Sequence, residues 1–206
     1  MASAMQREHL ARAARALNAG TRTGAFPSLI LMTDEKRSPD PVRCARALPK
    51  GAAIILRHTH DRARAALAAQ LRTIARARGL RLLIAGDAHL AQRVRADGLH
   101  LPDARAREAS HWKALRPSWL ITVAAHSARG LAIASSAGAD AALLAPVFAT
   151  ASHKGRTPLG VAKLRAIAMH ATLPVYALGG IDASRIGRLR GARLAGIAAI
   201  GALIPD

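Results

Sequence analysis

Cysteine and aromatic residues are scarce in this chain. Cys44 is the single cysteine among 206 residues, so no disulfide can form within the chain, and we expect a reducing, cytoplasmic setting. Phe, Trp and Tyr together make up 2% of the residues, whereas hydrophobic residues make up 51%. The chain is long enough to bury a sizeable core. That core must therefore be built from Leu, Ile, Val and Ala.

Long hydrophobic runs are also lacking. No apolar run approaches the roughly 18 residues that a membrane span needs, so we expect no membrane partner. Residues 1–20 lack the continuous apolar stretch and the cleavage-like site of a secretory signal. They are Arg-rich and amphipathic, as an organellar transit peptide can be. We nevertheless expect residues 1–25 to form an N-terminal helix and a lead-in to the domain.

Acidic residues are few. The sequence has 12 Asp and Glu against 31 Lys and Arg, a net charge of +19. Nucleic-acid-binding proteins often carry such an excess, but here the arginines are spread over nearly every predicted helix, and aromatic side chains that could stack on bases are nearly absent. We expect the charge to attract phosphorylated small molecules instead. A high-GC genome that favours Ala and Arg codons is a second explanation.

Several motifs of catalysis and cofactor binding are missing. No G-x-G-x-x-G follows the first predicted strand, and neither H-E-x-x-H nor G-x-S-x-G occurs. His58 and His60, in "RHTH", have the spacing of one strand face, but no thiolate pair accompanies them. We expect both to be solvated loop histidines. Ser127 is expected to cap a helix and not to act as a nucleophile.

Short β-type runs alternate with stretches of helical periodicity along the whole chain. Helical spacing is clearest in residues 61–79 and 127–138, and Gly79 and Gly138 stand where helices should end. The strands are expected at residues 28–33, 52–57, 80–85, 97–101, 119–125, 140–146, 174–180 and 196–201.

This alternation predicts the fold class. Strand–helix alternation requires parallel strands joined by right-handed crossovers. Eight such units close a (β/α)8 TIM barrel of the α/β class. An open doubly wound sheet is the alternative. We find no linker, so a single domain is expected over residues 1–206.

Glycines end the last two predicted strands. In a TIM barrel the ligand site lies at the carboxyl ends of the strands, and phosphate is commonly held after strands seven and eight. Gly179 and Gly180 end the seventh strand, where bare backbone N–H groups can approach a phosphate. Ile200 and Gly201 end the eighth strand and offer further backbone donors beside a helix start. A Gly-Gly pair alone is also explained by a tight turn, but the two sites together favour phosphate binding.

Charged side chains follow other predicted strands. Arg57 closes an apolar run, where an arginine is poorly placed unless it meets an anion or forms a salt bridge. The sequence leaves these two possibilities open, with Asp34 or Asp87 as the salt-bridge partner. Asp87 is also expected to cap the helix that follows it. Further candidates at the strand ends are His100, Asp103, His126 and loop residues 150–154.

Five segments, in this order and spacing, resemble the thiamine phosphate synthase family, which also contains thiazole tautomerases. They are "LILMTD", "LLIAGDAHLAQRVRADGLHLPD", "VAAHSARGLAIASSAGADAALLAPVFATASHKGRTPLG", "PVYALGGID" and "GIAAIGALI". The resemblance implies a barrel that joins a pyrimidine methyl diphosphate to a hydroxyethylthiazole phosphate. It also implies that magnesium-bound pyrophosphate leaves, that a pyrimidine carbocation forms, and that the thiazole nitrogen attacks this carbocation.

The resemblance places the thiazole phosphate between the loop after the sixth strand and the two glycine sites. Thr150 and Ser152 match hydroxyl positions of that loop, and Gly201 replaces a usual serine. The substrate-binding residues implied on this side are Thr150, Ala151, Ser152, Gly179, Gly180, Ile200 and Gly201.

The family's residues for the diphosphate are mostly replaced. From a Gln-x-Arg-x-Lys pattern after the second strand only Arg57 survives, and Ala124 stands in place of a serine. His153, followed by Lys154, stands in place of a lysine. The resemblance therefore implies Arg57, His153 and Lys154 as the catalytic residues.

Magnesium is the cofactor that the resemblance implies, with an incomplete ligand set. Asp87 matches one aspartate ligand, the second falls on Arg105, and Asp103 lies two residues before Arg105. One carboxylate holds magnesium poorly. Two alternatives follow: Arg105 binds the departing pyrophosphate directly, together with Arg57 and Lys154, or Asp103 serves as the second metal ligand.

The leading hypothesis is therefore a transferase that makes thiamine phosphate from the phosphorylated thiazole and the pyrimidine diphosphate. The alternative is a paralogue that binds thiazole phosphate without coupling it, either a sensor or a tautomerase-like protein. A tautomerase is less expected because the histidine it would have at the position of Pro146 is missing. Nucleic acid is not an expected partner. The resemblance suggests a homo-oligomer, either a dimer or a trimer.

Overall fold

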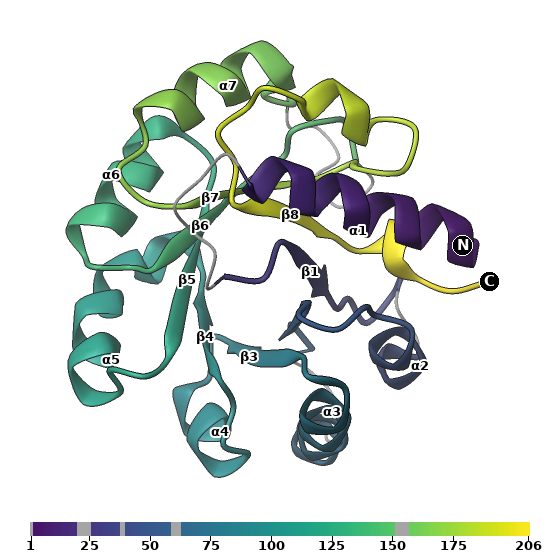
Figure 1. Ribbon diagram of the computed structural model, residues 1–206. Coiled ribbons are helices and arrows are strands. Elements are labelled where there is room, and N and C mark those ends of the chain that lie inside the picture. The colour runs from purple at the N-terminus through teal and green to yellow at the C-terminus, as the bar shows by residue number, and fades with distance from the viewer. Residues whose placement is uncertain (1, 20–25, 38–39, 59–62, 151–156) are drawn as a thin grey trace.

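Eight parallel strands form a closed barrel in the computed structural model, which describes residues 2–19, 26–37, 40–58, 63–150 and 157–206 (Figure 1). The strands pair in chain order, and β1 closes the barrel on β8 with Leu29 opposite Ile197. The predicted (β/α)8 barrel is therefore confirmed, and the open sheet is excluded. The strands are β1 (Leu29–Met32), β2 (Ala53–Leu56), β3 (Arg81–Ala85), β4 (Gly98–Leu101), β5 (Leu120–Ala125), β6 (Ala141–Leu144), β7 (Val175–Leu178) and β8 (Gly196–Ala199).

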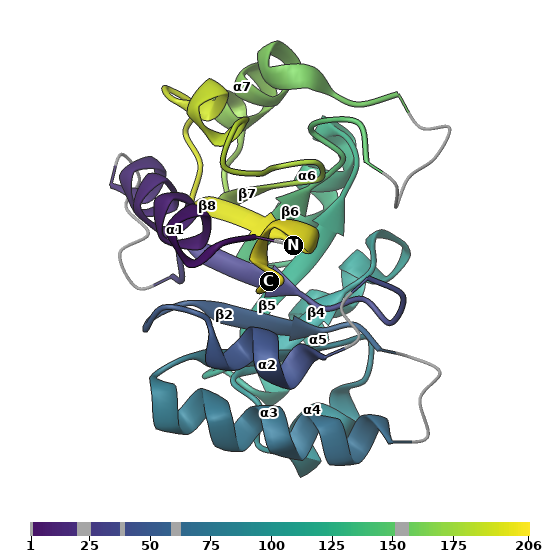
Figure 2. The same cartoon turned by 90° about the vertical axis from the view of Figure 1, so that its right-hand side faces the viewer.

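Helices surround the barrel (Figure 2). The α-helices are α1 (Ala4–Asn18), α2 (Pro41–Arg46), α3 (Arg64–Arg78), α4 (Ala88–Arg93), α5 (Ala109–Leu115), α6 (Ala128–Ser136) and α7 (Gly160–His170). The 3₁₀ helices are η1 (Asp103–Glu108), η3 (Ile186–Leu189) and η4 (Gly201–Leu203). None of the described helices is long and apolar enough to span a membrane.

Local signals in the sequence fix where several helices begin and end. Asp87 accepts a hydrogen bond from the backbone of Leu90 at the start of α4, and Ser127 caps α6 in the same way through Gly130. Gly79 ends α3 in the left-handed conformation, with φ of 64°. These caps confirm the helix boundaries that the sequence predicted.

Two layers of apolar side chains make the core. Every residue of β1 is buried, and its side chains alternate between the two layers. Leu29 and Leu31 pack against the surrounding helices, whereas Ile30 and Met32 point into the barrel. Tyr176 also lies inside, where its hydroxyl donates to the carbonyl of Pro27 at 2.7 Å, and burial raises the pKa of this hydroxyl.

The helix α1 covers the part of the barrel where the chain closes on itself. It packs on β8, η3 and β1, and Figure 1 shows it beside β8. A short parallel bridge between Ala2 and Pro205 holds the two ends of the chain side by side. The N-terminal segment thus supplies a helix that packs on β8.

Two aspartates stabilise the end of the barrel at which the strands begin. Asp97 accepts the backbone N–H of Leu82 at 2.8 Å and pairs with Arg72 at 2.6 Å. Asp140 repeats this arrangement with the N–H of Ile121 and with Lys113. Each carboxylate thereby joins two strands to one helix.

We expect Asp97→Ala to lower the free energy of unfolding by about 1.5–3 kcal/mol, because hydrogen bonds to a charged group are lost. The Arg72 side chain is only 16% exposed, so it would also be left without its partner in a poorly solvated place. Asp140→Ala is the matched control, with a smaller expected loss because Lys113 is 35% exposed and can be hydrated. Urea unfolding of the three proteins measures both effects; equal losses would contradict the explanation from burial.

Candidate active site

The largest cavity at the barrel mouth brings together most of the residues predicted to bind the thiazole phosphate. It has a volume of about 430 Å³ and lies at the carboxyl ends of β7 and β8. Its walls include five predicted residues, namely Thr150, Gly179, Gly180, Ile200 and Gly201, and three arginines, namely Arg37, Arg57 and Arg185. The remaining lining residues are Leu178, Ile181, Asp182, Ala199 and Ala202.

Close packing requires both glycines at the end of β7. Gly179 and Gly180 have φ of 104° and 65°, a region that side chains disfavour. A Cβ on Gly180 would lie 2.6 Å from the carbonyl oxygen of Ala149. The β6 loop runs directly alongside, since the N–H of Phe148 donates to the carbonyl of Gly179 at 3.0 Å. Gly179 and Gly180 can therefore form a tight turn and also let a ligand approach their backbone N–H groups.

Gly201 differs from this pair. A Cβ at this position would meet nothing within 4 Å, and its φ is not in the left-handed region. Neither packing nor backbone geometry requires a glycine here. The absent side chain leaves the rim of the cavity open beside a backbone N–H.

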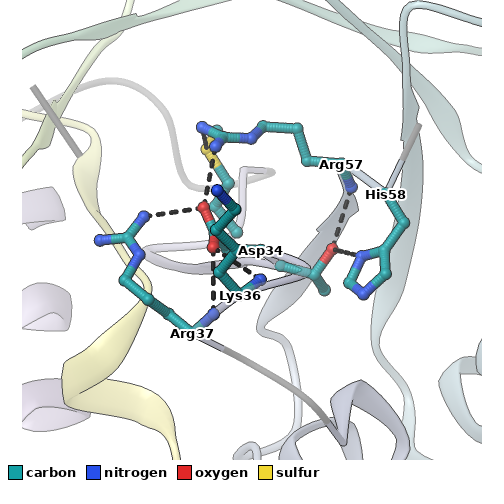
Figure 3. Close-up of polar contacts among 7 residues, drawn as sticks. Asp34, Lys36, Arg37, Arg57 and His58 are labelled. Carbon is teal, nitrogen blue, oxygen red and sulfur yellow. Dashed lines mark hydrogen bonds and ion pairs between the residues drawn. The ribbon is translucent and has the colours of Figure 1, made fainter. Parts of the chain in front are cut away.

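Asp34 joins two arginines at the wall of this cavity (Figure 3). Its Oδ2 accepts from Arg37 at 2.9 Å and from Arg57 at 3.0 Å. Hydrogen bonding from Arg37 holds the pKa of the Asp34 carboxyl below its ordinary value. Of the alternatives open from sequence, the salt bridge of Arg57 is formed, and its partner is Asp34. Among the described residues, the other Nη of Arg57 bonds to the sulfur of Met32 alone, at 3.6 Å, so Arg57 keeps donors for an anion.

The sequence context predicted a solvated loop histidine at position 58, but the structure shows that His58 is buried. It is 5% exposed, and its Nδ1 lies 2.9 Å from Oγ1 of the buried Thr33. The same Oγ1 accepts the backbone N–H of Arg57. Thr33 therefore ties together the ends of β1 and β2 and draws His58 inward. His60 lies outside the described residues.

A second cavity of about 290 Å³ opens at the centre of the barrel mouth. Its walls are mostly apolar, and it shares Arg57 and Leu178 with the larger cavity. Two histidines line it, His100 and His126. The remaining lining residues are Met32, Ala85, Gly86, Pro102, Ala124, Leu143 and Ala145.

Hydrogen bonds orient both histidines. His126 must carry its proton on Nδ1, because this atom donates to the carbonyl of Ala145 at 2.8 Å. Nδ1 of His100 lies 2.9 Å from Oγ1 of the buried Thr122. Burial, and secondly the charge of Arg57, lower the pKa of His100 to about 4. His100 is therefore neutral near pH 7.

His100 is expected to make the stability of the protein depend on pH. Its ordinary pKa is 6.5 and its folded pKa is about 4, so between these values the unfolded state binds more protons, and stability falls as the pH is lowered. The loss should approach roughly 3 kcal/mol and should be absent above the upper value. In His100→Gln the contribution of this residue to the pH dependence of the unfolding free energy should disappear. Urea unfolding at a series of pH values tests it, and parallel curves for parent and variant would refute it.

The two carboxylates predicted to hold magnesium contact other groups in the structure. Asp87 caps α4 through Oδ1, and its Oδ2 lies 3.3 Å from Nη1 of Arg64. Asp103 lies beside α6: a Cβ on Gly130, in the first turn of this helix, would be 3.2 Å from Oδ1 of Asp103. No group of three or more His, Cys, Asp or Glu in the described part of the chain is placed to hold a metal.

Arg105 adds a further positive charge beside Asp87. It donates to the carbonyl of Gly86 at 2.8 Å and forms two hydrogen bonds, of 2.6 and 2.7 Å, with Glu108. These bonds hold the pKa of Glu108 below its ordinary value. A cation bound at Asp87 would lie among guanidinium groups. The guanidinium groups of Arg64 and Arg105 thus compete with a metal cation for Asp87, and magnesium stays a hypothesis from the resemblance.

Other features of the site escaped the sequence analysis. Arg37 and Arg185 line the large cavity, and Arg64 pairs with Asp87 while its buried Nε has no hydrogen-bond partner in the described part of the chain. Their positions depend on loops that fold back over the mouth, which no local pattern shows. Of the predicted residues, Ala151, Ser152, His153 and Lys154 lie outside the described part of the chain.

The closed barrel places this chain among the TIM-barrel proteins, a class whose ligand sites lie at the carboxyl ends of the strands. A family model described as thiamine monophosphate synthase matches residues 29–203. This match covers most of the sequence. The chain belongs to the thiamine monophosphate synthase family.

Individual relatives agree with this family. A protein of Aquifex aeolicus, provisionally named thiamine-phosphate synthase 2, is 31% identical over 166 residues, which cover 78% of this chain and 89% of the relative. The thiamine-phosphate synthase of Chloroflexus aurantiacus is 31% identical over 154 residues, covering 72% and 68%. Thiamine phosphate pyrophosphorylase from Pyrococcus furiosus has the same fold, with a TM-score of 0.68, 24% identity and 84% of each chain covered.

Proposed function

We propose that this protein is a transferase that couples 4-amino-2-methyl-5-(diphosphooxymethyl)pyrimidine with 4-methyl-5-(2-phosphooxyethyl)thiazole and releases pyrophosphate. The observation that carries the proposal is the pair of adjoining cavities. Both open at the carboxyl ends of the strands, and they share Arg57 and Leu178. Two substrates bound in them would meet at this shared wall.

The larger cavity suits the thiazole phosphate. Gly180 and Gly201 line a space with several cations on its walls, and bare backbone N–H groups bind phosphate oxygens well. Thr150 adds a hydroxyl to the same wall. The proposal also keeps Ser152 as a residue that binds the thiazole phosphate.

The smaller cavity suits the pyrimidine. Met32, Leu143 and Leu178 supply apolar walls for an aromatic ring. His100 is neutral and buried there, so it does not repel a pyrimidine cation as a protonated histidine would. A diphosphate on the methyl carbon would reach Arg57, which lies between the two cavities.

The proposed step is a displacement at that methyl carbon. The bond between this carbon and the diphosphate oxygen breaks, and its electron pair leaves with pyrophosphate. The lone pair of the thiazole nitrogen then forms the new carbon–nitrogen bond. Arg57 stabilises the negative charge that develops on the leaving group. His153 and Lys154 are proposed to assist from the loop after β6, and Arg105 to add positive potential from the β3 side.

Calorimetric titration with each substrate separately tests this function against its alternative. A synthase must bind both the thiazole phosphate and the pyrimidine diphosphate. A paralogue that only senses the thiazole phosphate would bind this ligand and not the diphosphate. The unphosphorylated thiazole alcohol serves as the control ligand, and binding of neither phosphorylated substrate would end the proposal.

A further inference from the structure

Arg185 stands at the edge of the large cavity, on the segment that joins β7 to η3. Asp182 orders this segment, because its Oδ1 accepts the backbone N–H groups of Ser184 and Arg185, both at 3.0 Å. Nη1 of Arg185 donates to the carbonyl of Gly180 at 3.0 Å and lies 3.5 Å from Oδ2 of Asp182. The guanidinium group is thus held beside one of the glycines of the proposed phosphate site.

Part of this guanidinium group is uncommitted. Its Nε and Nη2 have no hydrogen-bond partner among the described residues, and 46% of the side chain is exposed. Arg37 and Arg57, the other arginines of the cavity, are both bound to Asp34. Arg185 is therefore the cavity arginine that is not bound to Asp34, and its Nε and Nη2 remain for a ligand. A guanidinium fork of this kind matches two oxygens of a phosphate.

We propose that Arg185 binds the phosphate of the thiazole substrate through Nε and Nη2, opposite the backbone N–H of Gly201. Gly201 offers no side chain to a ligand, and Arg185 supplies the side-chain donors on this part of the wall. The inference rests on the proposed function, since it assigns a recognition residue to the same cavity. The chemical class recognised is a phosphate monoester of a small heterocyclic alcohol.

Arg185→Gln tests the assignment, with Arg188→Gln as the matched control. Arg188 lies three residues further along the chain, in η3, and its guanidinium carbon is 5.2 Å from the ring of Phe148, compared with 6.0 Å for Arg185. Arg188 does not line the cavity. We expect Arg185→Gln to bind the thiazole phosphate about ten- to a hundredfold more weakly, with binding of the unphosphorylated alcohol unchanged. Arg188→Gln should bind both as the parent does.

The outcomes separate this inference from the function on which it rests. If the parent binds the thiazole phosphate and Arg185→Gln binds it equally well, the inference is overturned and the function stands. If the parent does not bind it, the function fails, and titration with inorganic phosphate decides the inference. Weaker phosphate binding in Arg185→Gln but not in Arg188→Gln supports it; equal binding, or none in the parent, overturns it.

Discussion

Arg57→Gln is expected to lower the rate of thiamine phosphate formation by about a hundred- to a thousandfold, the usual loss when one donor to a developing negative charge is removed. Arg57 lines both cavities and retains donors beyond its bond to Asp34. The fold should survive, because Asp34 keeps its bond to Arg37. Turnover is measured by separating thiamine phosphate from its precursors, and thermal unfolding checks the fold.

Arg57→Lys separates the effect of the positive charge from the effect of the planar guanidinium group. Lysine keeps the positive charge but loses the planar fork, so its activity should lie between that of the parent and that of Arg57→Gln. The affinity for the thiazole phosphate should change much less than the rate. A rate within threefold of the parent in Arg57→Gln would show that the leaving group is stabilised by other residues.

Gly180→Ala is expected to lower the free energy of unfolding by about 2–4 kcal/mol, from backbone strain together with overpacking. The new Cβ would lie 2.6 Å from the carbonyl oxygen of Ala149 and 2.8 Å from Cβ of Phe148, at a φ of +65°. The β6 loop would have to move away from β7, so thiazole phosphate binding should weaken as well. Urea unfolding and calorimetric titration measure the two effects.

Gly187→Ala is the control for this substitution. Gly187 lies on the same connection between β7 and β8, where an added Cβ meets nothing within 4 Å and φ is not left-handed. The free energy of unfolding of Gly187→Ala should differ from that of the parent by no more than about 0.5 kcal/mol. A similar loss in both variants would mean that the close approach of the β6 loop is not the cause.

The sequence was sufficient to predict the barrel because its strands are separate apolar runs bounded by polar and glycine residues. Each predicted strand contains the observed one, as residues 80–85 contain β3 and residues 119–125 contain β5. The capping functions of Asp87 and Gly79 were also predictable, since a cap depends on neighbours in the chain. Strand order then followed from the alternation of strands and helices.

The glycine sites could likewise be assigned to one cavity. In a closed parallel barrel the ends of β7 and β8 are adjacent, so Gly180 and Gly201 had to face the same space. Side-chain pairing was not predictable in this way. His58, which follows β2, has its Nδ1 beside Oγ1 of Thr33, which follows β1, and Asp87 meets Arg64 from the start of α3. Such contacts depend on how loops from different strands fold over the mouth.

Coupling of the two substrates by the purified protein tests the central claim most directly. The protein is incubated with the pyrimidine diphosphate and the thiazole phosphate, with magnesium in one series and with a chelator in another, and Arg57→Gln is run in parallel. We expect thiamine phosphate and pyrophosphate in equal amounts from the parent protein and far less from the variant. Absence of thiamine phosphate in both series, from folded protein that binds both substrates, would contradict the account.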